Sequence, residues 1–128
     1  MKYFHSRIFN ADFEKTEEEV TQALQARGFG IITTVDVTHT FKEKLNKNFR
    51  KYKILGACNP QNAYKAIHAE DKIGLMLPCN VILQEKDHNH TEVAAIDPVA
   101  SMLAVENEAL KPIAETIRDE LRKAIDAA

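Results

Sequence analysis

Residues 73–96 read IGLMLPCNVILQEKDHNHTEVAAI, and this segment is the most informative one for the fold. Its first part, 73–83, is an almost continuous apolar run, which predicts a strand buried on both faces. Pro78 cannot donate to a sheet ladder, so we expect a bulge or a sheet edge there. Residues 87–90 have the composition of a hairpin turn, and residues 91–96 are predicted to return as the partner strand. A strand, a tight turn and a second strand predict antiparallel pairing.

On both sides of this hairpin, strand patterns alternate with helix patterns. Runs of β-branched and aromatic residues predict strands at 2–9, 30–37 and 52–58. Apolar residues at helical spacing predict helices at 12–27, from 59 onward and at 109–127, with shorter ones within 38–49 and 97–105. This order predicts an α+β fold, a single domain over residues 1–128, with helices packed on one face of a mainly antiparallel sheet.

A few residues mark where these elements begin and end. Asp12 is predicted to cap the first helix, and Gly28 to follow it in a left-handed conformation. Gly56 predicts a bulge or a close approach within its strand. Asn59-Pro60 is a strong helix start, because Asn caps and Pro fits the first helical position. In the helix that begins at residue 59, Ala63, Ala66 and Ile67 are predicted to face inward. In the helix at 109–127, the inward face is predicted to hold Ile113, Ile117, Leu121 and Ile125.

Composition limits the classes of function. The 128 residues are 45% hydrophobic and 28% charged, which is typical of a globular domain, and the net charge of −2 gives no general attraction to nucleic acid or anionic membranes. The longest uncharged stretch, residues 73–84, is too short for a membrane helix. Arg7 and Asp12 interrupt any signal-peptide pattern at the start. With only two cysteines, the chain is expected to be cytoplasmic.

Four short motifs resemble those of a known family. They are GFG at 28–30, FKEKL at 41–45, ILGACNP at 54–60 and LPCNV at 77–81. With them the chain resembles the domain of unknown function 302 family over nearly its whole length. The resemblance implies an α+β domain with the strand order of the TATA-binding-protein-like fold, and a homodimer. It implies neither DNA binding nor an activity, because a fold does not determine a function.

The two Cys-Asn segments carry the candidate site. Cys58 ends a predicted strand beside the Asn59 cap, where unpaired N–H groups and the positive helix end favour an anion and a more nucleophilic thiol. Cys79 lies at the predicted break in another strand. If the two strands are neighbours, Cys58, Asn59, Cys79 and Asn80 line one pocket for a small molecule or anion. Lys44, within the FKEKL motif, is the predicted basic ligand contact.

Other interpretations of these residues stay open. Free cysteines are often simply buried, and Asn59 is already explained as a cap, so the domain is also compatible with a structural or interaction module without a ligand. A thiol-dependent metal-binding or redox protein is a further alternative. Zinc needs more ligands than two thiolates, and His68 lies about 15 Å along a helix from Cys58. No metal site and no cofactor are therefore predicted.

Residues 42–53 form a basic segment with six positive side chains and one negative. Interleaved aromatic residues make it compatible with single-stranded nucleic acid, with steering of a small anion, or with a plain solvated connector. The acidic balance of the whole chain argues against nucleic acid as a partner of this segment.

Enzymatic activity has no support in the sequence, because no catalytic motif is present and no general base can be placed near Cys58. The sequence therefore predicts a non-enzymatic binding domain.

Overall fold

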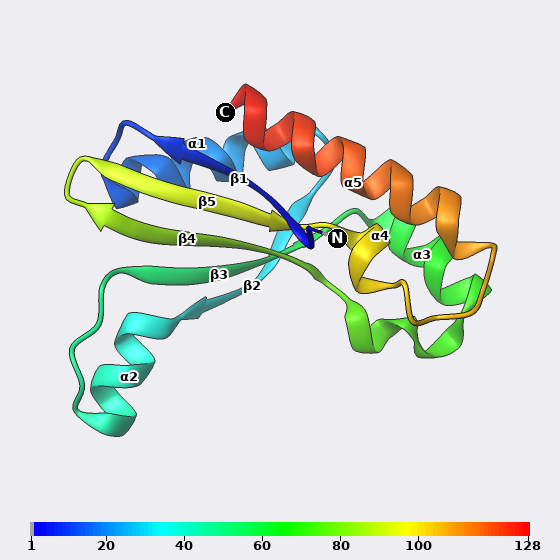
Figure 1. Ribbon diagram of the computed structural model, residues 1–128, viewed down its shortest axis with the longest axis horizontal. Helices are drawn as coiled ribbons and strands as arrows, with labels where there is room; N and C mark the ends of the chain where they lie inside the picture. Colours follow the sequence, from blue (N-terminus) through cyan, green and yellow to red (C-terminus); the bar gives the residue numbers. More distant parts are fainter. Residues whose placement is uncertain (1) are drawn as a thin grey trace.

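Within residues 2–128, which the computed structural model describes, five strands form one antiparallel sheet (Figure 1). The strands are β1 (Phe4–Phe9), β2 (Gly30–Asp36), β3 (Tyr52–Cys58), β4 (Cys79–Asp87) and β5 (His90–Ile96). The helices are α1 (Phe13–Ala26), α2 (Val37–Leu45), α3 (Pro60–Ala69), the 3₁₀ helix η1 (Asp71–Met76), α4 (Pro98–Ser101) and α5 (Leu110–Ala127). The strand order is β1-β5-β4-β3-β2. The predicted α+β fold class is confirmed.

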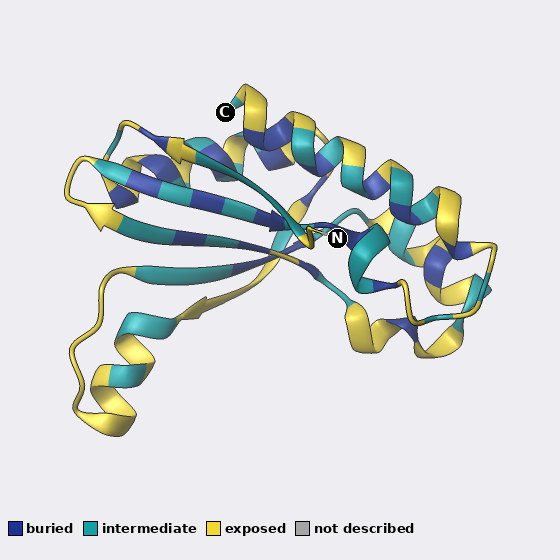
Figure 2. Ribbon diagram, viewed as in Figure 1, coloured by how far each residue is buried: buried dark blue, intermediate teal, exposed yellow. Residues whose placement is uncertain are grey.

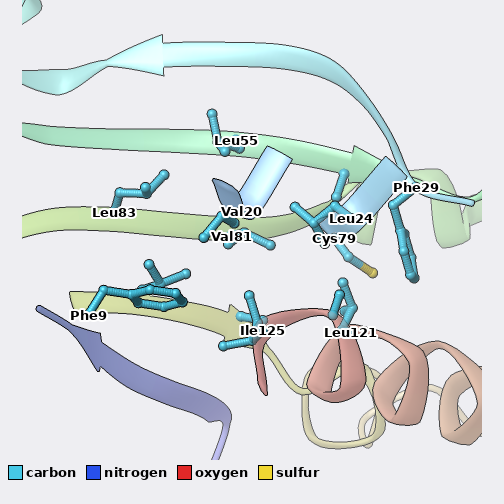
Figure 3. Close-up of a cluster of buried hydrophobic side chains, with 14 of the residues drawn as sticks. Phe9, Val20, Leu24, Phe29, Leu55, Cys79, Val81, Leu83, Leu121 and Ile125 are labelled. Carbon is cyan, nitrogen blue, oxygen red and sulfur yellow. The ribbon is translucent and has the colours of Figure 1, made fainter. Parts of the chain in front are cut away.

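The core lies between one face of the sheet and two helices, α1 and α5. Alternate residues of β3, β4 and β5 point toward these helices, because successive side chains of a strand face opposite sides. Figure 3 shows this cluster, in which labelled side chains of α1, α5, β3 and β4 pack together with Phe9 of β1 and with Phe29. Its most deeply buried members include Val20, Leu24, Leu55, Val81, Leu83, Val93, Leu121 and Ile125.

The opposite face of the sheet lies away from both of these helices, and we call it the open face. The strand registers assign its residues in pairs, such as Ile82 beside Ala94 and Ile54 beside Ile82. Figure 2 shows β2 and α2 largely exposed at one side of it. The open face comprises Phe4, Ser6, Ile8, Thr33, Val35, Tyr52, Ile54, Gly56, Asn80, Ile82, Gln84, Glu92, Ala94 and Ile96.

The predicted capping residues occupy their expected places. The Asp12 carboxylate accepts a 2.8 Å hydrogen bond from the backbone of Lys15, and Asn59 caps α3. Gly28 has a φ of 83°, and the N–H of Phe29 donates to the Leu24 carbonyl at 2.9 Å, which completes the turn after α1. These local interactions explain why the helix starts could be predicted from single residues.

The prediction of one strand over residues 73–83, buried on both faces, is wrong. Its first part is η1, which inserts Ile73 into a second small core, and the strand begins only at Cys79. In β4 burial alternates, because helices cover one face and the other is open. Pro78 precedes the first paired residue, so β4 needs no bulge there and lies in the centre of the sheet. A short apolar run cannot by itself separate a helical turn from a strand.

Two predictions about the helices also need correction. Ile67 does not face inward but is 46% exposed, because α3 packs on the domain mainly through the small side chain of Ala66. The helix predicted over 97–105 ends at Ser101, and turns continue from there. The helix expected within 38–49 spans Val37–Leu45, and β4 continues to Asp87 rather than ending at residue 83; the remaining boundaries lie within two residues of the predicted ones. In the described part of the chain, residues 2–128, no helix has the length and apolar character to cross a membrane.

Candidate functional site

The structure brings three of the five predicted site residues together. Cys58, Asn59 and Cys79 line one cavity at the end of β3, the start of α3 and the start of β4. Its volume is about 20 Å³, which is room for roughly one water molecule. Phe29, Ala63, Leu77, Pro78 and Ile117 form most of its remaining wall. The predicted proximity of the cysteines thus exists, in a small and mainly apolar space.

The two cysteines differ in their surroundings. Cys79 is 5% exposed, and Figure 3 shows its sulfur among the core side chains. Burial raises the pKa of the Cys79 thiol to about 11, and the nearby Cys58 adds to this effect. Cys58 is half-buried, and both are free thiols. Residues 2–128 contain no group of three or more His, Cys, Asp or Glu side chains placed to hold a metal ion.

We expect Cys79 to stabilise the fold only as a neutral thiol. Folding raises its pKa from the ordinary 9.0 to about 11, so its contribution is complete below about pH 9 and is lost as the pH rises toward 11. The difference in unfolding free energy between wild type and Cys79→Ala should therefore shrink over this interval. Denaturant unfolding at several pH values measures it. A difference that is constant up to pH 11 would contradict this assignment.

Asn80, the fourth predicted residue, points to the other side of the sheet. It lines a cleft of about 360 Å³ on the open face. The floor of this cleft is apolar, with Tyr52, Gln84 and Glu92 at one end and Asn80 at the other. Its lining consists of Tyr3, Phe4, Tyr52, Asn80, Ile82, Gln84, Glu92, Ala94, Ala95 and Ile96. Successive residues of a strand face opposite sides, so Cys79 and Asn80 cannot share one pocket within a chain.

A chain of hydrogen bonds fixes the end of this cleft that Gln84 and Glu92 form. The Arg50 guanidinium donates from Nε to Gln84 Oε1 at 3.0 Å, and Gln84 Nε2 donates to Glu92 Oε1 at 2.8 Å. Lys86 Nζ lies 3.9 Å from the same Glu92 oxygen. Arg50 also lies over the rings of Phe49 and Tyr52, at 4.4 and 5.8 Å from their centroids. The guanidinium is therefore held in place beside the cleft.

Lys44, the fifth predicted residue, is separate from the cysteines within one chain. It lies on α2, next to the start of β3, whereas Cys58 ends that strand. Seven strand residues span about 20 Å, so no shared ligand of small size reaches both. Elsewhere in the basic segment, Lys51 pairs with Glu14 and Lys53 with Glu17 on α1, at 2.6 and 2.9 Å. These ion pairs attach the segment to the domain.

Three other depressions have volumes similar to or larger than that of the open-face cleft. One of about 450 Å³ lies between α4 and α5, and one of about 610 Å³ lies between α1 and α5, where the ion pair of Arg27 and Glu120 spans it. The third, about 410 Å³, is filled at its edge by Lys51 and Glu14. The cleft on the open face combines aromatic residues, an apolar floor and the uncommitted side chains of Asn80 and Tyr52, so we regard it as the candidate site.

The sequence did not reveal most residues of this cleft. Tyr52, Ile82, Gln84 and Glu92 come from three strands, and only the register places them on one side. The signal in the sequence is the alternation within β4, where Asn80, Ile82 and Gln84 follow at intervals of two. The apolar residues of η1 precede the strand and merge with it into one apolar run, so the alternation is not visible in the sequence.

Together, the fold and the cleft define a small α+β protein with one antiparallel sheet and one sheet face left uncovered. The chain matches the family model described as "Domain of unknown function DUF302" over residues 5–128 and belongs to that family. It is similar to the crystal structure of an uncharacterized conserved DUF302 protein from Bacillus stearothermophilus, with a TM-score of 0.90, 25% identity and 98% of each chain covered. No curated protein matches it. The resemblance seen in the motifs is confirmed.

Proposed function

We propose that this protein is a cytoplasmic, non-enzymatic binding domain that takes a small amphipathic molecule in the cleft on its open face. The observation that carries the proposal is the cleft of about 360 Å³, which falls within the usual size of ligand sites. Two free cysteines fit a reducing compartment. The homodimer that the family resemblance implies is part of the same proposal.

The chemistry of the cleft favours a ligand with an apolar body and polar ends. Phe4, Ile82 and Ala94 offer a flat apolar floor, on which a ring or a short acyl chain would lose contact with water. The Tyr52 hydroxyl at one end and the Asn80 amide at the other have no hydrogen bond among the side-chain interactions of residues 2–128. Arg50 beside Gln84 and Lys86 beside Glu92 offset the negative charge of Glu92, so the cleft would also admit an anionic head group.

The cysteine cavity supports a ligand less well. A volume of about 20 Å³ admits no molecule larger than water, and a thiol with a pKa of about 11 is neutral at physiological pH and a poor nucleophile. Ligand contacts by Cys58, Asn59, Cys79 and Lys44 remain predictions. Thiol-dependent metal binding or redox chemistry also remains an alternative prediction, and it would require the two sulfur atoms to act together.

Titration with the fluorescent anion 8-anilinonaphthalene-1-sulfonate tests the proposal. We expect the wild-type protein to bind this probe, and Ala94→Trp to weaken binding by about tenfold or more, because the indole fills the floor of the cleft. Ile67→Trp is the matched control, since Ile67 is exposed on α3 and does not line the cleft. Near-UV circular dichroism verifies that each variant is folded.

The same titration separates the two candidate pockets. Cys58→Ser should bind the probe like wild type, since Cys58 does not line the open-face cleft. Loss of binding in Cys58→Ser with normal binding in Ala94→Trp would show that the probe does not occupy the open-face cleft and would overturn the proposal. Absence of binding to wild type would overturn it as well.

A further inference from the structure

The cleft on the open face has two ends, and Ile82 in the middle of β4 separates them. Asn80 and Gln84 lie two residues to either side of Ile82, so their Cα atoms are about 13 Å apart along the strand. Gln84 pairs with Tyr52 on β3 and with Glu92 on β5, so these three side chains stand in a row across the sheet. We call this row the Glu92 end and the opposite side the Asn80 end.

The Asn80 end carries a positive charge. The register of β4 and β5 places Ile96 beside Asn80, and Ile96 pairs with Phe4 of β1. The Lys2 ammonium lies 5.1 Å from the centroid of the Phe4 ring. Lys2 forms no ion pair within residues 2–128, and the amide of Asn80 offers N–H donors. An acidic group of a ligand therefore finds both a cation and a hydrogen-bond donor at this end.

The Glu92 end, in contrast, accepts hydrogen bonds. Glu92 Oε1 accepts from Gln84 Nε2 at 2.8 Å and lies 3.9 Å from Lys86 Nζ, whereas Oε2 has no partner within the described residues. The Glu92 side chain is only 23% exposed, so water screens its charge weakly. An ionised carboxylate only accepts hydrogen bonds. Its second oxygen therefore suits a ligand hydroxyl, and it repels a ligand carboxylate placed against it.

The floor between the two ends suits flat rings. Ile82 and the small Ala94 lie side by side in register, and Tyr3, Phe4 and Tyr52 surround them with aromatic side chains. Aromatic groups pack well on one another in offset or edge-on arrangements. A rigid ring system also loses less conformational freedom on binding than a flexible acyl chain does.

We propose that the cleft takes an aromatic hydroxy acid, with its carboxylate at the Asn80 end and its hydroxyl at the Glu92 end. This inference rests on the proposed function, because it names the class of ligand for the same cleft. The length agrees: a hydrogen bond of about 2.9 Å at each end leaves about 7 Å of the 13 Å. A molecule of one or two rings, with its two groups at opposite ends, spans this length.

An NMR titration with 6-hydroxy-2-naphthoate, followed through isoleucine methyl signals, tests this orientation. We expect a saturable shift of the Ile82 signals and a dissociation constant about tenfold lower than that of 2-naphthoate, which lacks the hydroxyl. Naphthalene-2,6-dicarboxylate carries a second carboxylate in place of the hydroxyl. It should bind more weakly than 6-hydroxy-2-naphthoate, because Glu92 repels the added charge. Tighter binding of the dicarboxylate would overturn the assignment of the Glu92 end.

Two conservative variants test the ends separately. Lys2→Gln should raise the dissociation constant of 6-hydroxy-2-naphthoate about threefold and leave that of 2-naphthol, which has no carboxylate, unchanged. Tyr52→Phe should reduce the advantage of 6-hydroxy-2-naphthoate over 2-naphthoate about threefold, since it removes one partner of the ligand hydroxyl. The matched controls are Lys65→Gln and Tyr64→Phe, at exposed positions of α3 that do not line the cleft. Both should bind every probe like wild type.

The outcomes distinguish this inference from the proposed function. Equal dissociation constants for 6-hydroxy-2-naphthoate and 2-naphthoate would overturn the inference, as would equal losses in Lys2→Gln and Lys65→Gln. The proposed function survives these results if 8-anilinonaphthalene-1-sulfonate still binds and Ala94→Trp still weakens its binding. If neither that probe nor the naphthoates bind, the proposed function fails and the inference fails with it. Circular dichroism verifies that each variant is folded.

Discussion

Replacing Gly56 by alanine is expected to lower the free energy of unfolding by about 3 kcal/mol, at the upper end of the cost of overpacking. A Cβ at this position would overlap the Thr33 hydroxyl oxygen and lie 2.7 Å from Pro78 Cγ. The Thr33 hydroxyl can rotate only at the cost of a new contact with its own Cβ substituents, and the Pro78 ring is rigid, so it is the contact that yields least. The close approach predicted at Gly56 is therefore the point where three segments meet.

Urea unfolding of three variants measures this effect. Gly74→Ala is the control, because no atom lies within 4 Å of a Cβ built there, and its stability should remain within about 0.5 kcal/mol of wild type. Adding Thr33→Ala to Gly56→Ala should restore part of the loss, since it removes the overlapping oxygen. If Gly56→Ala is as stable as Gly74→Ala, the close packing described here is wrong.

Leu121→Ala is expected to cost about 3 kcal/mol, within the range of 2–5 for a buried leucine. Leu121 is 1% exposed in the middle of α5, where it packs into the core cluster that joins α5 to α1 and the sheet. Truncation leaves a cavity that helix and sheet cannot close, because both are fixed by their other contacts.

The control for this change is Leu103→Ala, at a position that is 69% exposed. Its unfolding free energy should differ from wild type by less than about 0.5 kcal/mol. Equal losses at both positions in thermal or urea unfolding would indicate that α5 is not the helix that closes the core.

Local chemistry made much of the fold predictable. The caps Asp12 and Asn59, the left-handed Gly28 and the hairpin at 87–90 each depend on residues next to one another in the sequence, so they could be assigned without knowledge of the tertiary structure. The face of α5 was predictable for the same reason, because its apolar residues recur every four positions.

The parts that could not be predicted depend on contacts distant in sequence. Residues 73–83 satisfied the pattern of a buried strand, but packing of Ile73 against α3 and α5 made the first half a 3₁₀ helix. The candidate site had the same difficulty. The Cys-Asn pairs suggested one pocket, whereas the alternation of β4 sends Cys79 into the core and Asn80 onto the open face.

Methyl relaxation of isoleucine-labelled protein by a soluble paramagnetic agent tests directly whether the cleft on the open face is the binding site. Ile82 lines this cleft, whereas Ile67 is exposed on α3 and does not. We predict that saturating 8-anilinonaphthalene-1-sulfonate shields the Ile82 methyl groups from the agent, whereas those of Ile67 relax as they do without the probe. Unchanged relaxation of Ile82 when the probe is bound would contradict the proposal.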